Sequence, residues 1–463
     1  MAESPAKRAL REKPVGKIRL AELLGALCHA LDLTEGQPEG HCVRCCWIGI
    51  HVGREMGLPE ARLHDLYYTL LLKDLGCSSN AARICQLYLA DDLAFKRDFK
   101  EIGSSLPQAL RFVLSHTGLG AGLAERFRAI ITILQNGGEI ARELIEVRCH
   151  RGADIARRMR FSEAVANGIK NLDEHWDGGG KPEGAKGDEI PLFAQIALLA
   201  QIVDVFHTSS GPAEAAGEVR HRSGTWFAPA VVAAFERAAA PPDFWAGLRD
   251  EALPIKMLAL EPAQDLQPVD EDYLDEIAEA FAQVIDSKSP FTNGHSERVA
   301  IFADLIAAEL DFTSEERRWL KRAALLHDIG KLGVSNMILD KPGKPNEEEW
   351  KSIRMHAVHT ETILSRIGAF SDIAAMAAGH HERLDGKGYP KGLTAADLSL
   401  ETRILSVADI FDALSAERPY RKAMPVGEAF ALMEGMVGTA IDGDCFAALR
   451  RAIPLAEMTK VAA

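Results

Sequence analysis

The feature that most constrains this fold is an internal duplication: the second half of the chain repeats a pattern of the first half in the same order. Segment 40–77 parallels segment 294–331. Each begins with Gly-His, carries Leu-Leu-x-Asp-x-Gly near its end, and places that aspartate 33 residues after the histidine. Segment 174–182 parallels 382–390, because both read Glu-x-x-Asp-Gly-x-Gly-x-Pro. With 463 residues available, this repeat predicts two domains of one fold.

The two copies differ in spacing mainly through one insertion in the first copy. If His150 corresponds to His356, 76 residues separate Asp74 from its histidine, whereas 28 separate Asp328 from its own, a difference of 48. The extra residues fall within an insertion at about 78–142.

Domain boundaries follow from the repeat and from a proline-rich break. We expect a first domain at 18–252 and a second at 269–463. Segment 253–268 carries three prolines among acidic residues and is predicted to be the linker.

The apolar periodicity of both copies is helical. His41 and His295 each begin a stripe in which apolar residues recur at steps of four and three, and alternating β patterns are scarce. Thr313 and Glu316 have capping-box spacing ahead of the segment that carries His327. We therefore expect an all-α fold.

Composition excludes several classes of partner. A net charge of −14 argues against broad binding to nucleic acid or to an anionic membrane. No stretch of 18 uncharged apolar residues is present, so we expect no membrane span and a cytoplasmic protein. Cys42, Cys45 and Cys46 lack a second ligand pair at zinc-site spacing, and reduced, partly buried cysteines are expected.

The second copy carries a set of imidazoles and carboxylates without thiolates. Such ligands suit Fe, Mn, Zn, Ni or Co, with Fe or Mn favoured. Adjacent side chains on a helix point about 100° apart, so a neighbouring pair can serve two ions. We expect two divalent ions that activate a water, with the carboxylate of Asp328 as their bridge. The candidate ligands are His295, His327, Asp328, His356, His380, His381 and Asp409.

From about residue 269 onward, the chain resembles the HD-GYP subgroup of the HD metal-dependent phosphohydrolases. The motifs stand in the family's order: the His327-Asp328 pair, the His-His-Glu-x-x-Asp-Gly-x-Gly-Tyr-Pro run at 380–390, and Arg-Pro-Tyr-Arg at 418–421. The resemblance implies an all-α domain with a multinuclear metal centre that hydrolyses cyclic dinucleotides. By the same resemblance, the first copy is a degenerate HD-like domain in tandem with the second.

The resemblance also implies a division of labour within the centre. One metal site takes His295, His327, Asp328 and Asp409, and the other takes His356, His380 and His381 around the Asp328 bridge. Some family members hold a third ion through a glutamate four residues before the first histidine; Phe291 stands there in this chain.

Catalytic and substrate-binding residues are inferred in the same way. Asp328 and Lys331 are the predicted catalytic pair, with Lys331 four residues after His327 and on the same face if the helix continues. The resemblance implies a substrate pocket and partner contacts at the glycine-rich loop. The predicted substrate contacts are Lys331, Asp385, Gly388, Tyr389, Pro390, Arg418 and Arg421.

The expected substrate is cyclic di-GMP or 3',3'-cyclic GMP-AMP, opened to a linear dinucleotide and onward to GMP. A GGDEF-type or other signalling protein is a predicted partner at the loop, and a homodimer is a further expectation. Two alternatives stay open: a nucleotide receptor or signalling scaffold without turnover, and a general HD phosphohydrolase acting on mononucleotides.

The chemistry of the first copy is eroded. Lys73 replaces the histidine of the HD pair, and a lysine there repels a divalent metal and neutralises the neighbouring aspartate. Leu172 and Asp173 replace the paired histidines. Asp204, in Ile-Val-Asp-Val-Phe, is expected to correspond to Asp409, in Val-Ala-Asp-Ile-Phe. Four ligand-type positions are then expected to survive: His41, Asp74, His150 and Asp204. We expect a metal-free domain that is either a regulatory or dimerisation module or a scaffold remnant.

Overall fold

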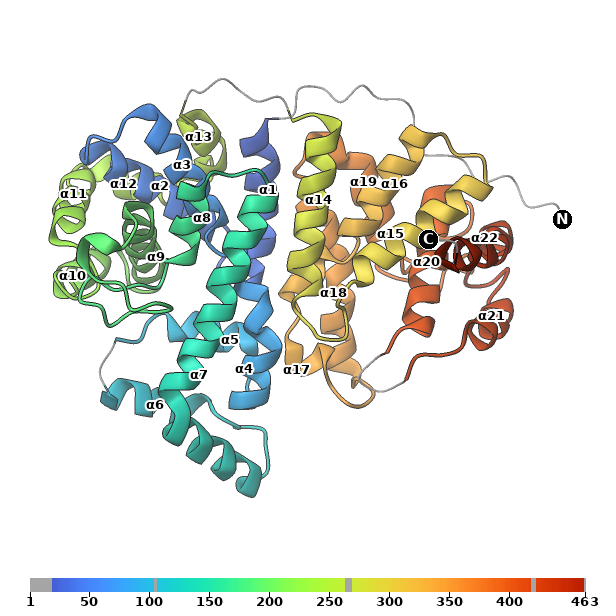
Figure 1. Cartoon of the computed structure of the whole chain (residues 1–463), viewed down its shortest axis with the longest axis horizontal. Coiled ribbons are helices and arrows are strands. Elements are labelled where there is room, and N and C mark those ends of the chain that lie inside the picture. Colours follow the sequence, from blue (N-terminus) through green and yellow to red (C-terminus); the bar gives the residue numbers. More distant parts are fainter. Residues whose placement is uncertain (1–18, 104–105, 263–268, 418–421, 462–463) are drawn as a thin grey trace. The chain divides into compact units, whose positions relative to one another are not determined.

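A computed structural model describes residues 19–103, 106–262, 269–417 and 422–461 (Figure 1). These residues divide into an N-terminal unit, 19–269 with 335–337, and a C-terminal unit, 270–334 with 338 onward. Every named element in the described residues is a helix, which confirms the all-α prediction.

The N-terminal unit contains a helical domain with one inserted subdomain. Its helices are α1 (Leu20–Thr34), α2 (His41–Glu55), α3 (Glu60–Leu72), η1 (Cys77–Asn80), α4 (Ala81–Tyr88), α5 (Asp92–Phe99), α6 (Leu106–His116), α7 (Leu123–Arg158), α8 (Glu163–Lys170), η2 (Gly187–Glu189), α9 (Leu192–Ser210), α10 (Pro212–His221), α11 (Pro229–Ala239), α12 (Pro242–Gly247) and α13 (Leu253–Leu260).

The C-terminal unit repeats the arrangement without the insertion. Its helices are α14 (Glu271–Asp286), α15 (His295–Glu309), α16 (Ser314–Leu326), η3 (Ile329–Gly333), α18 (Glu347–Leu364), η4 (Gly368–Phe370), α19 (Ser371–Ala378), α20 (Leu400–Ser415), α21 (Val426–Glu434) and α22 (Gly443–Val461), and the short α17 (Asn336–Leu339) spans the division. Helix α15 packs against α16, α20 and α22 and forms the centre of the unit.

Local signals place the helix that begins the site. Gly294, with φ of 67°, adopts the left-handed conformation that glycine tolerates, and α15 begins at the next residue, His295. Buried Asp286 then accepts hydrogen bonds from the backbone N–H and the hydroxyl of Ser296. This carboxylate satisfies a helix-start donor and fixes the direction in which α15 leaves the turn.

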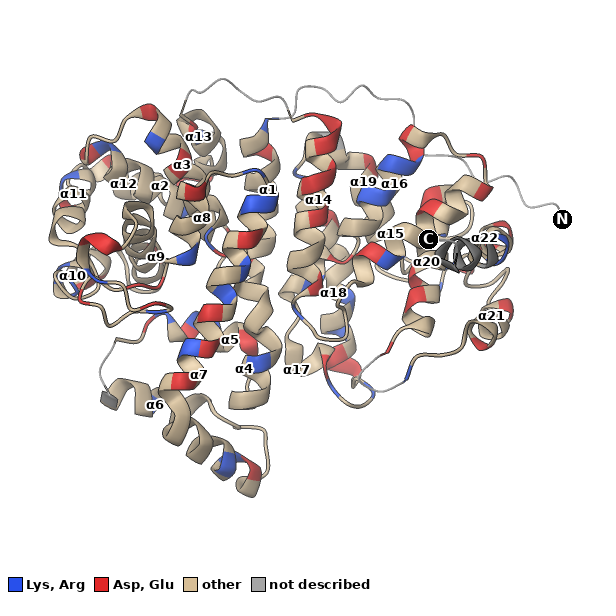
Figure 2. Cartoon of the chain, in the orientation of Figure 1, with Lys and Arg blue, Asp and Glu red and all other residues tan. Residues whose placement is uncertain are grey.

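Helix α16 begins and ends where the sequence indicates. The predicted capping box is present, with Thr313 accepting from the N–H of Glu316 and the Glu316 carboxylate accepting from Thr313. Figure 2 shows basic residues on α16 and acidic residues on α14. Arg318 and buried Arg322 of α16 each lie 2.6 Å from Asp275 of α14. These contacts hold the helix that ends directly before His327.

The predicted linker was partly wrong. Residues 253–260 form helix α13, and Met257 on it is buried in the N-terminal unit. Pro254 lies in the first turn of the helix, where its missing N–H costs no hydrogen bond. A proline that looked like a break is therefore compatible with a helix start.

The insertion has a small core of its own. Helices α4 and α5 and the first part of α7 contribute buried side chains to it, and α6 adds Phe112. Its members are Ile84, Tyr88, Phe95, Phe112, Ile133, Ile140 and Leu144. The 36-residue α7 thus spans both the insertion and the conserved helical framework.

Helix α9 is the one described helix that is long and apolar enough to cross a membrane. Of its most apolar window, 72% is buried inside the protein. The helix packs against α2 and α10, so its apolar character is that of a core helix. All eight cysteines are free and buried, as expected.

Candidate metal centre

The seven predicted ligands converge in the C-terminal unit from five helices. His295 is the first residue of α15, His356 lies in α18, and Asp409 lies in α20. The two adjacent pairs, His327-Asp328 and His380-His381, follow the last turns of α16 and α19. Ends of helices leave side chains free to point inward, which explains why two ligand pairs occur there.

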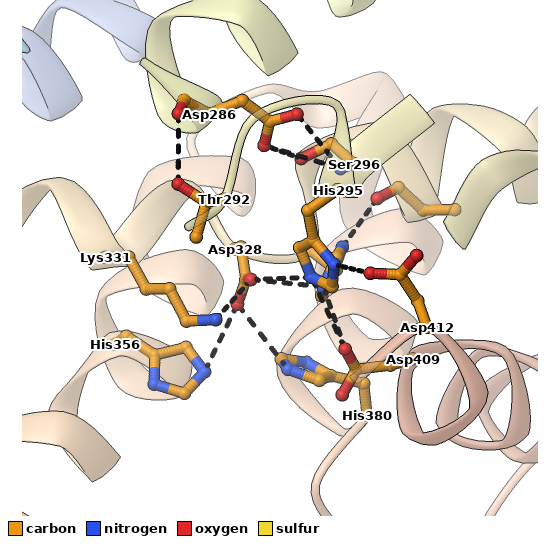
Figure 3. A network of polar contacts seen from close by, with 12 residues as sticks. Asp286, Thr292, His295, Ser296, Asp328, Lys331, His356, His380, Asp409 and Asp412 are labelled. Carbon is orange, nitrogen blue, oxygen red and sulfur yellow. Dashed lines mark hydrogen bonds and ion pairs between the residues drawn. The ribbon is translucent and has the colours of Figure 1, made fainter. Parts of the chain in front are cut away.

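Asp328 lies at the middle of the cluster, and its two oxygens face different histidines (Figure 3). Oδ2 is 3.3 Å from Nε2 of His295 and 3.3 Å from Nε2 of His327. Oδ1 is 3.6 Å from Nε2 of His356 and 3.7 Å from Nε2 of His380. A carboxylate with one oxygen toward each histidine group has the geometry of a bridging ligand.

Asp409 is a second carboxylate that lies near histidines of the cluster. Its Oδ1 is 3.4 Å from Nε2 of His295 and 3.8 Å from Nε2 of His327. Its Oδ2 is 4.0 Å from Nδ1 of His381. The arrangement agrees with one group of His295, His327 and Asp409 and another of three histidines from α18 and α19.

Hydrogen bonds on the outer ring nitrogens fix how the imidazoles point. Nδ1 of His327, His356 and His380 each lies 2.5–2.6 Å from a backbone carbonyl three residues earlier. Nδ1 of His295 is 2.6 Å from the carboxylate of Asp412. With Nδ1 as the donor, each Nε2 presents a lone pair to the centre.

The inward-facing atoms fit a divalent metal. Buried Nε2 atoms of His295, His327, His356 and His380 have no hydrogen-bond partner among the described residues, and neither has Oδ1 of Asp328. Buried polar atoms without partners are costly unless something compensates them. Because these atoms lie within 4.8 Å of one another in groups of three, bound metal ions would satisfy them.

The electrostatics favour ligand-competent protonation states. Burial lowers the pKa of His380 to about 3 and that of His356 to about 4, so both imidazoles are neutral. Burial alone would raise the pKa of Asp328, but nearby His327 and Lys331 hold it well below its usual range. The site therefore places the neutral imidazoles of His356 and His380 beside an ionised carboxylate, as metal binding requires. At His295, burial is outweighed by hydrogen bonds to Asp328 and Asp412, which raise its pKa to about 9.

Lys331 reaches the centre by a different route from the one expected. Helix α16 ends at Leu326, and Lys331 lies in the following 3₁₀ helix, so it does not share a helix face with His327. Its Nζ is 2.5 Å from Oδ2 of Asp328. The ammonium is partly exposed and points at Asp328, the predicted bridge. An incoming phosphate oxygen can replace the Asp328 carboxylate as the acceptor for this ammonium.

The glycine-rich loop is held by one buried carboxylate. Glu382 accepts hydrogen bonds from the backbone N–H groups of Lys391, Gly392 and Leu393. A Cβ on Gly388 would lie 2.5 Å from the Cα of Glu382, so only glycine fits there. The loop is thereby folded tightly against the end of α19.

Other predicted substrate residues have mixed placements. The Tyr389 ring lies 4.8 Å from that of His381, at the edge of the centre, and Pro390 follows it. Asp385 pairs with Arg383 and accepts the N–H of Lys387, so its carboxylate braces the loop. Arg418 and Arg421 lie outside the described residues.

Comparisons with known proteins agree with this geometry. An HD domain family model matches residues 121–231 and 279–445. The 3'3'-cGAMP-specific phosphodiesterase 3 of Vibrio cholerae is 55% identical over 436 residues, covering 94% of this chain and 95% of that protein. The chain belongs to the HD domain family. A matched segment in each half, with the two similar helical units, makes it a tandem HD protein whose C-terminal HD domain carries the HD-GYP signature.

Two further relatives of this HD protein extend the comparison. A crystal structure of the cyclic GMP-AMP-specific phosphodiesterase V-cGAP3 of V. cholerae covers 95% of this chain and 99% of its own, with 50% identity and a TM-score of 0.66. The cyclic di-GMP phosphodiesterase response regulator RpfG of Xanthomonas campestris is 34% identical over 206 residues, which are 44% of this chain and 53% of that protein.

Close approaches at two glycines show which residues of the two HD domains are equivalent. A Cβ on Gly76 would lie 1.9 Å from the carbonyl oxygen of Arg148, and one on Gly330 would lie 1.9 Å from that of His356. Arg148 thus occupies the position of His356. The predicted correspondence of His150 was wrong by two residues, and the His150 side chain is 48% exposed.

Asp204 also has a different counterpart from the predicted one. Its Oδ2 is 2.7 Å from Nδ1 of His41, just as Asp412 lies 2.6 Å from Nδ1 of His295. Asp204 therefore matches the carboxylate that orients the first histidine, and the predicted match to Asp409 was wrong by three residues.

Cations occupy ligand positions in the N-terminal HD domain. Nζ of Lys73, at the position of the second histidine, contacts Asp74 and lies 3.0 Å from Nε2 of His41 and 3.3 Å from Oε1 of Gln201. Gln201 stands where the C-terminal domain has Asp409. Only His41 and Asp74 keep their residue type, and Lys73 with Arg148 supplies buried positive charge.

Two supporting residues of the C-terminal HD domain escaped the sequence argument. Asp286 braces Ser296 at the start of α15, and Arg298 donates from Nε to Asp412 at 2.5 Å. A signal was present, because an aspartate nine residues before and an arginine three residues after the leading histidine also flank His41. Conserved spacing in the eroded copy thus marks support of the fold as well as chemistry.

Proposed function

We propose that this chain is a metal-dependent phosphodiesterase that hydrolyses 3'3'-cyclic GMP-AMP, with cyclic di-GMP as a second substrate, to a linear dinucleotide. The observation that carries the proposal is the cluster of unpartnered, inward-facing imidazoles around the bridging geometry of Asp328. The choice of substrate rests on the V. cholerae relative, whose name specifies 3'3'-cGAMP and which matches 94% of this chain.

Two divalent ions, Fe or Mn, are proposed for the centre, held by His295, His327 and Asp409 on one side of Asp328 and by three histidines on the other. When bound, the ions supply Lewis-acid stabilisation of phosphoryl oxygens and lower the pKa of water. Binding of a GGDEF-type partner, a homodimer and a cytoplasmic location stay predictions from the sequence.

The protein's own residues position the reacting groups. Oxygen atoms of the scissile phosphate replace the Asp328 carboxylate as acceptors for Lys331, whose ammonium is already at the centre. Asp412 holds the ring of His295 in the tautomer that points Nε2 inward. Tyr389 covers the edge of the centre beside His381 and limits access of water.

Hydrolysis by protein purified anaerobically, together with elemental analysis, tests this function. We expect turnover of 3'3'-cyclic GMP-AMP by the wild type and its loss in Asp328→Ala. Asp304→Ala is the matched control, because Asp304 is a carboxylate on α15 in a surface pair with Arg317. A metal-loaded wild type that binds cyclic dinucleotides without hydrolysing them would support the receptor alternative instead.

A further inference from the structure

The side chains of Tyr389, Arg354 and Trp350 follow one another outward from the candidate metal centre. The Tyr389 ring lies 4.8 Å from His381, and the guanidinium carbon of Arg354 lies 5.4 Å from the centroid of the Tyr389 ring. The same guanidinium is 6.0 Å from the ring of Trp350, one turn earlier on α18. Arg354 is thus placed between two aromatic rings at the edge of the site.

The edges of the Arg354 guanidinium are available. Several other arginines of the C-terminal unit, such as Arg298, Arg317 and Arg318, are paired with a carboxylate. No described carboxylate lies within ion-pair distance of Arg354, which is an exposed residue. Its guanidinium lies near two aromatic rings, and no described carboxylate occupies its N–H donors.

Trp350 is also unusually placed for a structural residue. Its side chain is 44% exposed although it lies one helical turn from Arg354 on the helix that delivers His356. An exposed indole next to an arginine gives a flat platform with a polar edge. Platforms of this kind bind nucleobases through stacking and hydrogen bonds to the base edge.

The proposed substrate supplies a matching group, so the inference rests on the proposed function. A cyclic dinucleotide with one phosphate at the metals carries a purine close to the same site. Arginine donates two hydrogen bonds to O6 and N7 of guanine, whereas adenine offers one donor and one acceptor at the corresponding edge. The planar guanidinium of an arginine beside aromatic rings is suited to this bidentate contact.

We propose that Arg354, supported by Trp350 and Tyr389, binds the O6/N7 edge of a guanine in the substrate and makes the enzyme selective for guanine-containing cyclic dinucleotides. Arg354 is a substrate-binding and specificity residue. It neither contacts the candidate metal ligands through an ion pair nor takes part in bond cleavage.

The test removes either partner of the proposed contact. The substrate change is 3'3'-cyclic GMP-AMP with 7-deazaguanine, which lacks the N7 acceptor, and the protein change is Arg354→Met, which keeps the apolar stem. Each change alone is expected to lower kcat/KM about tenfold to a hundredfold, mainly through KM. Together they should cost no more than the protein change alone, because both remove the same contact.

Control variants separate the outcomes. Lys351→Met removes a cation three residues earlier on α18, where Lys351 pairs with Glu348 and its side chain is 71% exposed, and should leave kcat/KM unchanged. Additive losses from the deaza substrate and Arg354→Met would overturn the proposal and assign Arg354 to a phosphate or to structure. If the wild type hydrolyses no cyclic dinucleotide, it is the proposed function that fails.

Discussion

Four of the five histidines in the candidate metal centre use one ring nitrogen to hold the other in position. Three of them rely on backbone carbonyls, whereas His295 relies on the side chain of Asp412. A side-chain partner can be changed without altering the backbone, so this contact is open to experiment. The same carboxylate binds Arg298, which keeps it ionised and in place.

Asp412→Asn should therefore weaken metal binding while preserving the fold. The amide oxygen can still accept from Nδ1 of His295, but the negative charge that strengthens the imidazole as a ligand is lost. We expect metal affinity or turnover to fall about 10- to 100-fold. Metal retained after dialysis against a graded chelator gives the measurement, with Asp304→Asn as control. Equal retention by the two variants would contradict the orienting role.

Asp204 in the N-terminal HD domain predicts a pH-dependent stability. Burial raises its pKa, but bonds from His41 and Arg44 outweigh burial and bring the pKa down to about 2. A lowered carboxyl pKa stabilises the fold above pH 4, and this contribution disappears as pH falls toward 2. Asp204→Asn should lose about 2 kcal/mol at pH 7.

Urea unfolding of the full-length protein, monitored by hydrogen exchange of the backbone amides of α2, measures the contribution of Asp204 to stability. The difference in stability between wild type and Asp204→Asn should be constant from pH 7 to 5 and narrow below pH 4. A difference that persists unchanged to pH 3 would show that the ionised carboxylate is not its source.

At the scale of elements, the glycine-rich loop depends on the side chain of Glu382 as well as on its glycines. The Glu382 carboxylate accepts three backbone N–H groups from residues 391–393, and Glu174 accepts two in the equivalent N-terminal loop. Hydrogen bonds to a charged acceptor contribute roughly 1.5–3 kcal/mol. These hydrogen bonds therefore hold the loop that carries Tyr389 in place.

Glu382→Gln should loosen this loop without emptying the metal centre. One acceptor oxygen is replaced by a donor that cannot pair with an N–H, so residues 386–393 should exchange hydrogen faster. We expect KM to rise about tenfold, since 1.4 kcal/mol corresponds to that factor, while metal content stays at the wild-type value. Loss of metal together with activity would place Glu382 in support of the ligands instead.

Helix type and order were predictable from the sequence, but register between distant helices was not. Apolar periodicity and the Thr313 capping box indicate helices by local physics. The predicted match of Asp204 to Asp409 relied on similar neighbouring residues. An error of three residues is nearly one helical turn, so a side chain on the same face of the helix was matched. The hydrogen bond to His41 and the close approach at Gly76 reveal the true register.

In the molecule as a whole, the two HD domains compensate the negative charge of a buried aspartate in different ways. In the C-terminal domain, buried Asp328 lies among histidines, of which His356 and His380 are neutral, and we expect metal ions to supply the compensating positive charge. In the N-terminal domain, buried Asp74 contacts Lys73, whose own pKa Asp74 raises against the effect of burial. We expect this covalently attached cation to take the place of a metal ion there.

This difference predicts that the leading histidines of the two HD domains, His41 and His295, are not equivalent in metal binding. Each begins a helix after a left-handed glycine and donates to an aspartate, so alanine at either removes the same local contacts. His295→Ala should lower metal content below the wild-type value of about two ions per chain and abolish hydrolysis. His41→Ala should leave metal content and kcat unchanged, although it destabilises the N-terminal domain. Elemental analysis of both variants decides the matter, because a loss of metal from His41→Ala would place an ion in the N-terminal domain.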